Sequence, residues 1–128
     1  MDRWFVIVGA LLAMVAVAAG AFGAHGLAAY FEVHPDLAAT FDTAVRYQMT
    51  HALALLAISW ALTRWQSRLL GWAGALMIAG VVLFSGSLYG ISLFGVRWLG
   101  AVAPLGGTAL IGGWACLALG VWRGRRIE

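Results

Sequence analysis

Four long apolar stretches, separated by short polar links, dominate this sequence of 128 residues. They cover about 4–24, 43–63, 69–94 and 98–122, and each reaches the roughly 20 residues that a helix needs to cross a bilayer. Charged residues make up only 10 % of the chain, against about 25 % in soluble domains, which excludes a water-soluble globule. Because the links are short, neighbouring spans must run antiparallel. The sequence therefore predicts one all-α integral membrane domain, 1–128, built as an antiparallel bundle of four transmembrane helices.

A polar segment, 25–42, separates the first two apolar stretches. Its apolar residues recur every three or four positions, which is the spacing of a helix with one apolar face. They are Leu27, Tyr30, Phe31, Leu37 and Phe41. Helices of this kind are typical of segments that lie in the membrane interface. We therefore expect a short interfacial helix between spans 1 and 2, broken at Pro35.

The eight basic residues are all arginines, and they indicate how the chain crosses the membrane. Six of them lie at one side of the predicted bundle: Arg3, Arg64, Arg68, Arg123, Arg125 and Arg126. Only Arg46 and Arg97 lie at the other side. Cytoplasmic loops carry an excess of arginine and lysine, so we expect a multi-pass protein of the bacterial inner membrane with both termini in the cytoplasm. Since these charges flank the spans, we expect membrane lipids and no nucleic acid as partners.

Polar side chains gather in the outer half of the predicted bundle. At a rise of about 1.5 Å per residue, His51, Ser85 and Thr108 each lie about 20 Å from the tryptophan near the inner end of their span. The candidate polar cluster comprises His25, Arg46, Tyr47, Gln48, His51, Ser85, Ser87, Tyr89 and Thr108. Ionisable groups inside a span are candidates for function, and polar groups also join helices by hydrogen bonds. The residues alone leave both interpretations open.

Pro104, Gly106 and Gly107 predict a break in the fourth span, because proline removes a backbone hydrogen bond and glycine loosens a helix. Such a break either exposes carbonyl groups to a substrate or bends the helix to fit a neighbour. Metal-binding patterns such as Cys-x-x-Cys and His-x-x-x-His are missing from the sequence. No nucleophile shares its depth with a base. We therefore expect no metal site, no cofactor, no catalytic residue and no enzymatic activity.

Four segments occur in an order that suggests a family. They are Gly-Ala-Phe-Gly-Ala-His-Gly-Leu at 20–27, Thr-Ala-Val-Arg-Tyr-Gln-Met-Thr-His-Ala-Leu-Ala-Leu-Leu at 43–56, Leu-Phe-Ser-Gly-Ser-Leu-Tyr at 83–89, and Pro-Leu-Gly-Gly at 104–107 followed by Gly-Trp at 113–114. Over nearly its whole length the chain resembles the small bacterial inner-membrane proteins of domain-of-unknown-function family 423, to which eukaryotic transmembrane protein 256 is similar. The resemblance implies a four-span membrane protein without an established activity. The family pattern falls on His25, Tyr47, Gln48, His51, Ser85, Gly86, Ser87, Tyr89, Pro104, Gly106, Gly107 and Trp114.

Three functions stay open at this point. The first is an accessory or structural membrane component that associates with itself or with another membrane protein, and whose polar cluster fixes helix packing. The second is a small transporter or channel for protons or a small solute that uses the outer polar cluster. The third is binding of a lipid, a quinone or a haem. We favour the first, because the loops are short and no soluble domain is present.

Overall fold

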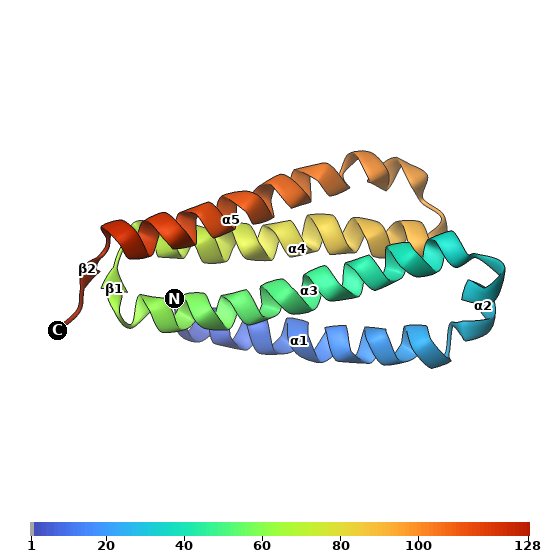
Figure 1. Cartoon of the computed structure of the whole chain (residues 1–128), viewed down its shortest axis with the longest axis horizontal. Coiled ribbons are helices and arrows are strands. Elements are labelled where there is room, and N and C mark those ends of the chain that lie inside the picture. Colours follow the sequence, from blue (N-terminus) through green and yellow to red (C-terminus); the bar gives the residue numbers. More distant parts are fainter. Residues whose placement is uncertain (1) are drawn as a thin grey trace.

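A computed structural model describes residues 2–128 and is almost entirely helical, which confirms the predicted all-α class (Figure 1). Four long helices account for most of the chain: α1 (Asp2–His25), α3 (Pro35–Leu62), α4 (Arg68–Phe94) and α5 (Ala103–Arg123). Two shorter helical pieces join them, α2 (Ala28–Val33) and the 3₁₀ helix η1 (Arg97–Ala101). Two strands of two residues each, β1 (Trp65–Gln66) and β2 (Arg125–Arg126), complete the described structure.

Within residues 2–128, three segments are long and apolar enough to cross a membrane: Arg3–His25, Arg68–Phe94 and Arg97–Arg123. They correspond to the first, third and fourth predicted spans. The second predicted span lies within α3, which is as long as the others at 28 residues but less apolar. The difference arises mainly from the first half of α3, which carries Asp36, Asp42 and Arg46.

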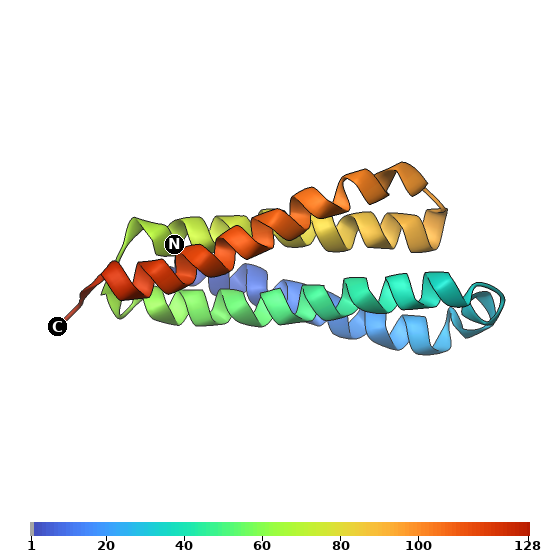
Figure 2. The same ribbon diagram turned by 45° about the horizontal axis from the view of Figure 1, so that its top comes forward.

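The long helices pack in chain order along the long axis of the molecule (Figures 1 and 2). α3 packs against α1 on one side and α4 on the other, α4 packs against α5, and α3 and α5 meet over only a short region. The apolar core lies among these helices and is centred on Leu55, Ile58 and Met77, which are fully buried. α3 and α4 therefore form the middle of the molecule, while α1 and α5 lie at its two sides.

The segment between α1 and α3 differs in part from the sequence prediction. A short helix, α2, is present, and the helical structure is interrupted at His34. Pro35 then begins α3, which continues without a break into the predicted second span at residue 43. Proline suits the first turn of a helix because the missing N–H has no partner there. α2 is tied to the end of α4, since the Tyr30 hydroxyl donates to the Ser92 carbonyl oxygen at 3.0 Å.

The link between α4 and α5 is longer than the predicted start of the fourth span at residue 98 suggests. α4 ends at Gly95, whose φ of 67° is the left-handed conformation that glycine adopts without strain. A turn of 3₁₀ helix follows, and α5 begins only at Ala103. Pro104 therefore lies in the first turn of α5, and the interruption of the helix precedes it.

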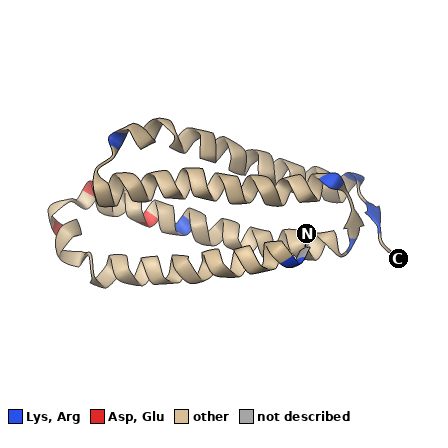
Figure 3. Cartoon of the chain, turned by 180° about the vertical axis from the view of Figure 1, so that it is seen from behind, with Lys and Arg blue, Asp and Glu red and all other residues tan. Residues whose placement is uncertain are grey.

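One end of the molecule carries most of the basic residues (Figure 3). The residues of this basic end are Arg3, Arg64, Arg68, Arg123, Arg125 and Arg126. β1 and β2 pair antiparallel there, with Trp65 opposite Arg126, and the Ile127 N–H donates to the Arg64 carbonyl oxygen. The ladder, which the sequence analysis did not predict, fastens the C-terminal tail to the link between α3 and α4.

Candidate functional site

One turn of α3 is joined by side-chain hydrogen bonds to all three other long helices. The buried side chain of Gln48 provides two of these bonds: its Nε2 donates to the Leu12 carbonyl oxygen of α1 at 2.8 Å, and its Oε1 accepts from the Tyr89 hydroxyl of α4 at 2.8 Å. One turn further along, His51 accepts a bond from Trp114 of α5. We call these residues, Gln48, His51, Tyr89 and Trp114, the α3 network.

The partners of His51 determine its tautomer. Its Nδ1 lies 2.6 Å from the Tyr47 carbonyl oxygen, which can only accept, so Nδ1 carries the proton. Its Nε2 lies 3.1 Å from the indole Nε1 of Trp114, which can only donate, so Nε2 is the acceptor. The imidazole is therefore neutral and buried, with both nitrogens engaged. In this arrangement it has no lone pair left for a metal ion.

The serines of α4 bind backbone carbonyl groups. Ser85 is buried and donates to the Ala44 carbonyl oxygen of α3 at 2.8 Å, which adds a link between the two central helices. Ser87 is also buried, but it donates to the Leu83 carbonyl oxygen of its own helix. Within residues 2–128, no buried side-chain nitrogen or oxygen lacks a hydrogen-bond partner. Most of the polar groups in the predicted cluster therefore form hydrogen bonds within the chain.

A pocket of about 400 Å³ lies beside His51, between α3 and α5, with α4 as its floor. We call it the α3–α5 pocket. Its lining residues are Tyr47, Thr50, His51, Phe84, Gly107, Leu110, Ile111 and Trp114. The aromatic rings form a continuous wall, because Tyr47 packs on Phe84 with centroids 4.5 Å apart and His51 meets Trp114 edge-on at 5.9 Å. The pocket is mainly apolar, with a few polar groups on one side, as small-molecule sites generally are.

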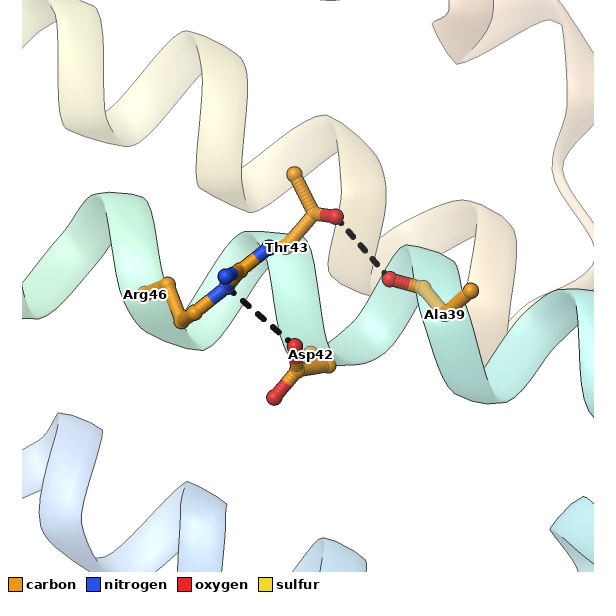
Figure 4. Close-up of polar contacts among 4 residues, drawn as sticks. All are labelled: Ala39, Asp42, Thr43 and Arg46. Atoms are coloured by element: carbon orange, nitrogen blue, oxygen red, sulfur yellow. Dashed lines mark hydrogen bonds and ion pairs between the residues drawn. The ribbon is translucent and has the colours of Figure 1, made fainter.

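Three members of the predicted cluster lie apart from both the α3 network and the pocket. His25 is exposed at the end of α1. Arg46 pairs with Asp42, one turn earlier on α3, at 3.2 Å, and both side chains are about 70 % exposed (Figure 4). Thr108 is exposed and donates to the Pro104 carbonyl oxygen of its own helix. These three residues therefore do not join the α3 network.

The two glycines predicted to break the fourth span lie inside α5 and have different surroundings. Gly106 is buried against α4: a Cβ there would lie 2.3 Å from the backbone nitrogen of Phe84. Gly107 lines the pocket, and a Cβ there would lie 3.8 Å from the Phe84 ring, at ordinary contact distance. Gly106 therefore permits close approach of α4 and α5, while Gly107 leaves space beside it.

Trp114, Phe84 and Thr50 take part in the network or the pocket but are not members of the predicted polar cluster. Of the three, only Trp114 falls on the family pattern. One signal was available: Trp114 lies about 12 Å along the helix from Trp122, too deep for an interfacial tryptophan. An indole N–H at that depth needs an acceptor, and His51 is the one it has.

The described residues offer no arrangement for a metal ion. Within residues 2–128, no group of three His, Cys, Asp or Glu side chains comes close enough to share one ion. Cys116 is a free thiol, half-buried on α5.

Comparisons with known proteins relate the chain to a family of membrane proteins. A family model described as "Protein of unknown function (DUF423)" matches residues 19–107. A UPF0382 membrane protein of Staphylococcus saprophyticus is 43 % identical over 119 residues, which is 93 % of this chain and 97 % of that protein. UPF0382 membrane proteins of Staphylococcus epidermidis and Bacillus subtilis are 45 % and 41 % identical, and cover 90 % of this chain and 92 % and 93 % of their own lengths. No solved structure matches the chain.

Proposed function

We propose that this chain, which belongs to the DUF423 family of membrane proteins, is an accessory or structural component of the membrane whose α3 network holds its helices in one arrangement. The observation that supports this proposal is the use of the polar groups. One turn of α3 is hydrogen-bonded to α1, α4 and α5. Helices in lipid gain no hydrophobic stabilisation from one another, so packing and interhelical hydrogen bonds must hold them together.

We further propose that α3 is the fourth span. The Phe5 ring of α1 lies against Gly74 of α4, so these two apolar helices begin on the same side of the molecule. If both cross the membrane in the same direction, the chain between them must cross back. α3 has 28 residues and a length of about 42 Å, which is sufficient. Two of its polar side chains, Gln48 and His51, are buried against other helices, where hydrogen bonds reduce the cost of placing them in lipid.

The charge distribution supports the predicted orientation in a bacterial inner membrane. The basic end carries six of the eight arginines, together with both described chain ends. The positive-inside rule then puts both termini in the cytoplasm. α2, at the opposite end, would lie at the outer surface as the interfacial helix, with Glu32 exposed to the headgroup region.

Self-association or binding to another membrane protein is the role in which a rigid helical unit of this size is most useful. α1 and α5 lie at the sides of the molecule and expose large apolar side chains, among them Met14, Val17 and Ile111. Lipid covers such faces in a single copy, and a second protein covers them in a complex. The proposal names no catalytic step, since the polar side chains of the network are bonded to one another.

A double-mutant cycle tests the proposal. His51→Phe and Trp114→Phe, alone and together, should lower the free energy of unfolding. The coupling energy between the two substitutions should be about 0.6 kcal/mol and at most about 1.7 kcal/mol, the range measured for interhelical hydrogen bonds in membranes. Thr108→Val is the matched control, because Thr108 has the same depth but bonds only within α5. Unfolding is measured by circular dichroism in mixed micelles across an SDS titration.

The same variants separate this proposal from the transport alternative. Each is reconstituted into liposomes and proton flux is followed with an enclosed pH-sensitive dye. A structural role predicts the same background flux for wild-type protein, His51→Phe and empty liposomes. A wild-type flux that a folded His51→Phe protein loses would overturn the proposal in favour of transport.

A further inference from the structure

We propose that the α3–α5 pocket is a binding site for a planar ring compound that carries carbonyl oxygens and dissolves in the membrane, the chemistry of a quinone head group. The proposal does not depend on the structural role of the α3 network. It rests on three features of the pocket: its opening toward the side of the molecule, its aromatic wall, and two hydroxyl groups that the protein leaves unused.

The pocket opens sideways, between two helices that barely touch. α3 and α5 both pack on α4 but meet each other over only a short region, which leaves a gap above Phe84. Residues at the edge of this gap are well exposed: Ile111 is 71 % exposed and Trp114 is 44 % exposed. In a membrane this edge faces lipid, so a ligand enters from the bilayer and must be apolar enough to dissolve there.

The aromatic wall favours a flat ligand. Tyr47, Phe84, His51 and Trp114 present faces and edges of rings to the same space. Aromatic rings pack on other planar rings in offset or edge-on geometry and gain energy beyond the area they bury. A volume of about 400 Å³ lies within the range of small-molecule sites, about 300–1,000 Å³.

Two hydroxyl groups supply the polar side of the site. Tyr47 and Thr50, one turn apart on α3, both line the pocket, and neither hydroxyl has a hydrogen-bond partner within residues 2–128. Thr50 differs in this respect from other helical threonines of the chain: Thr40 and Thr43 each donate to the carbonyl oxygen four residues earlier. A ligand with carbonyl oxygens would accept from both free hydroxyls.

These features distinguish a ring compound from a lipid chain. A saturated acyl chain would fill the apolar part of the pocket without using either hydroxyl or the flat aromatic wall. A carbonyl-bearing ring uses both. Removal of the two hydroxyls should therefore weaken the binding of the ring compound and leave that of a hydrocarbon unchanged.

The test uses the full-length protein in lipid nanodiscs with dimethylnaphthoquinone as the probe. Both free ring carbons of its quinone ring are methylated, so it cannot add to the thiol of Cys116. The control probe is dimethylnaphthalene, which has the same two rings without carbonyls. The apparent unfolding temperature is measured by circular dichroism over a titration of each probe, because a ligand that binds only the folded state raises this temperature saturably.

The wild-type protein should show a saturable rise with the quinone and a much smaller one with the hydrocarbon. The double variant Tyr47→Phe with Thr50→Val should raise the apparent Kd of the quinone about tenfold, as expected for the loss of two hydrogen bonds, without changing the response to the hydrocarbon. Gly107→Leu should fill the pocket and abolish the response. Gly86→Leu is its control, since a Cβ at Gly86 meets no atom within 4 Å and Gly86 lies outside this pocket.

Three outcomes would overturn the proposal. They are a wild-type protein without a saturable response to the quinone, a hydrocarbon that stabilises the protein as strongly as the quinone, and a double variant that binds the quinone as tightly as wild type. The double variant keeps the size of both side chains, so it decides the question even if Gly107→Leu does not fold. None of these substitutions replaces Gln48, His51, Tyr89 or Trp114 or removes a hydrogen bond of the α3 network, so failure here leaves the network proposal standing.

Discussion

Replacement of Gly106 by alanine should separate α4 from α5. A Cβ at this position would lie 2.3 Å from the Phe84 backbone nitrogen and 2.8 Å from the Phe84 Cα, closer than real Cβ atoms come to backbone. Backbone atoms within a helix cannot turn aside as a flexible side chain can. The whole of α5 must therefore shift away from α4, and the contact between them loosens along several turns.

The magnitude follows from two opposing effects. Inserting a methyl group into a well-packed contact costs about 1–3 kcal/mol, and more where nothing can yield. Replacement of glycine by alanine also stabilises the helix by about 1 kcal/mol, because alanine has the higher helix propensity. Gly107→Ala has the same propensity gain without the clash, because its Cβ meets only the Phe84 ring at 3.8 Å. The difference between the two variants cancels propensity and isolates the packing cost, about 1–3 kcal/mol.

The assay is reversible unfolding by SDS in mixed micelles, followed by circular dichroism, for wild type and both alanine variants. We expect Gly106→Ala to unfold at lower SDS than Gly107→Ala by a difference in this range, and Gly107→Ala to be as stable as wild type or slightly more stable. Equal stability of the two variants would refute the reasoning, since it would mean that α5 does not pack on Phe84 at Gly106.

Two further predictions use the same unfolding assay. Tyr89→Phe removes the donor to Gln48 and leaves a buried amide oxygen without its partner, so it should cost about 1–3 kcal/mol; a cost near zero would show that this bond is not formed. Asp42→Asn removes the ion pair with Arg46. Because the Arg46 side chain is 72 % exposed and that of Asp42 67 % exposed, the free energy of unfolding should change by less than about 0.5 kcal/mol; a larger loss would mean that the pair is shielded from solvent.

The helices could be predicted from the sequence, because they depend on local patterns. Apolar length predicts the spans that begin near Trp4 and Leu69. A fixed rise per residue puts His51 and Ser85 at one level, whereas Ser85 donates to the carbonyl oxygen of Ala44, which lies seven residues before His51 on α3. The direction of a side chain around its helix axis depends instead on which neighbour the helix meets. Thr108 shows the limit: the same estimate puts it level with His51, yet it is exposed, and Trp114 of the same helix is the partner that His51 has.

The helix boundaries near prolines were the least predictable part of the fold. At Pro35 and Pro104 the sequence suggested a break, and in both cases proline lies in the first turn of a helix. Proline both ends a helix before it and suits the start of one after it, so the residue alone does not say which occurs. The answer depends on where the preceding chain turns. That turn is at His34 in one case and at the 3₁₀ helix η1 in the other.

The position of α3 in the molecule explains why it is the least apolar of the long helices. α3 packs on both α1 and α4 and reaches α5, whereas α1 and α5 lie at the sides. A helix with neighbours on several sides can satisfy polar side chains within the protein, as Gln48 does with Leu12 and Tyr89. A helix at the side has fewer such partners, as α5 has through Trp114. If α3 crosses the membrane as proposed, its low hydropathy reflects its central position, and a polar helix between apolar ones is the pattern to expect of a central span.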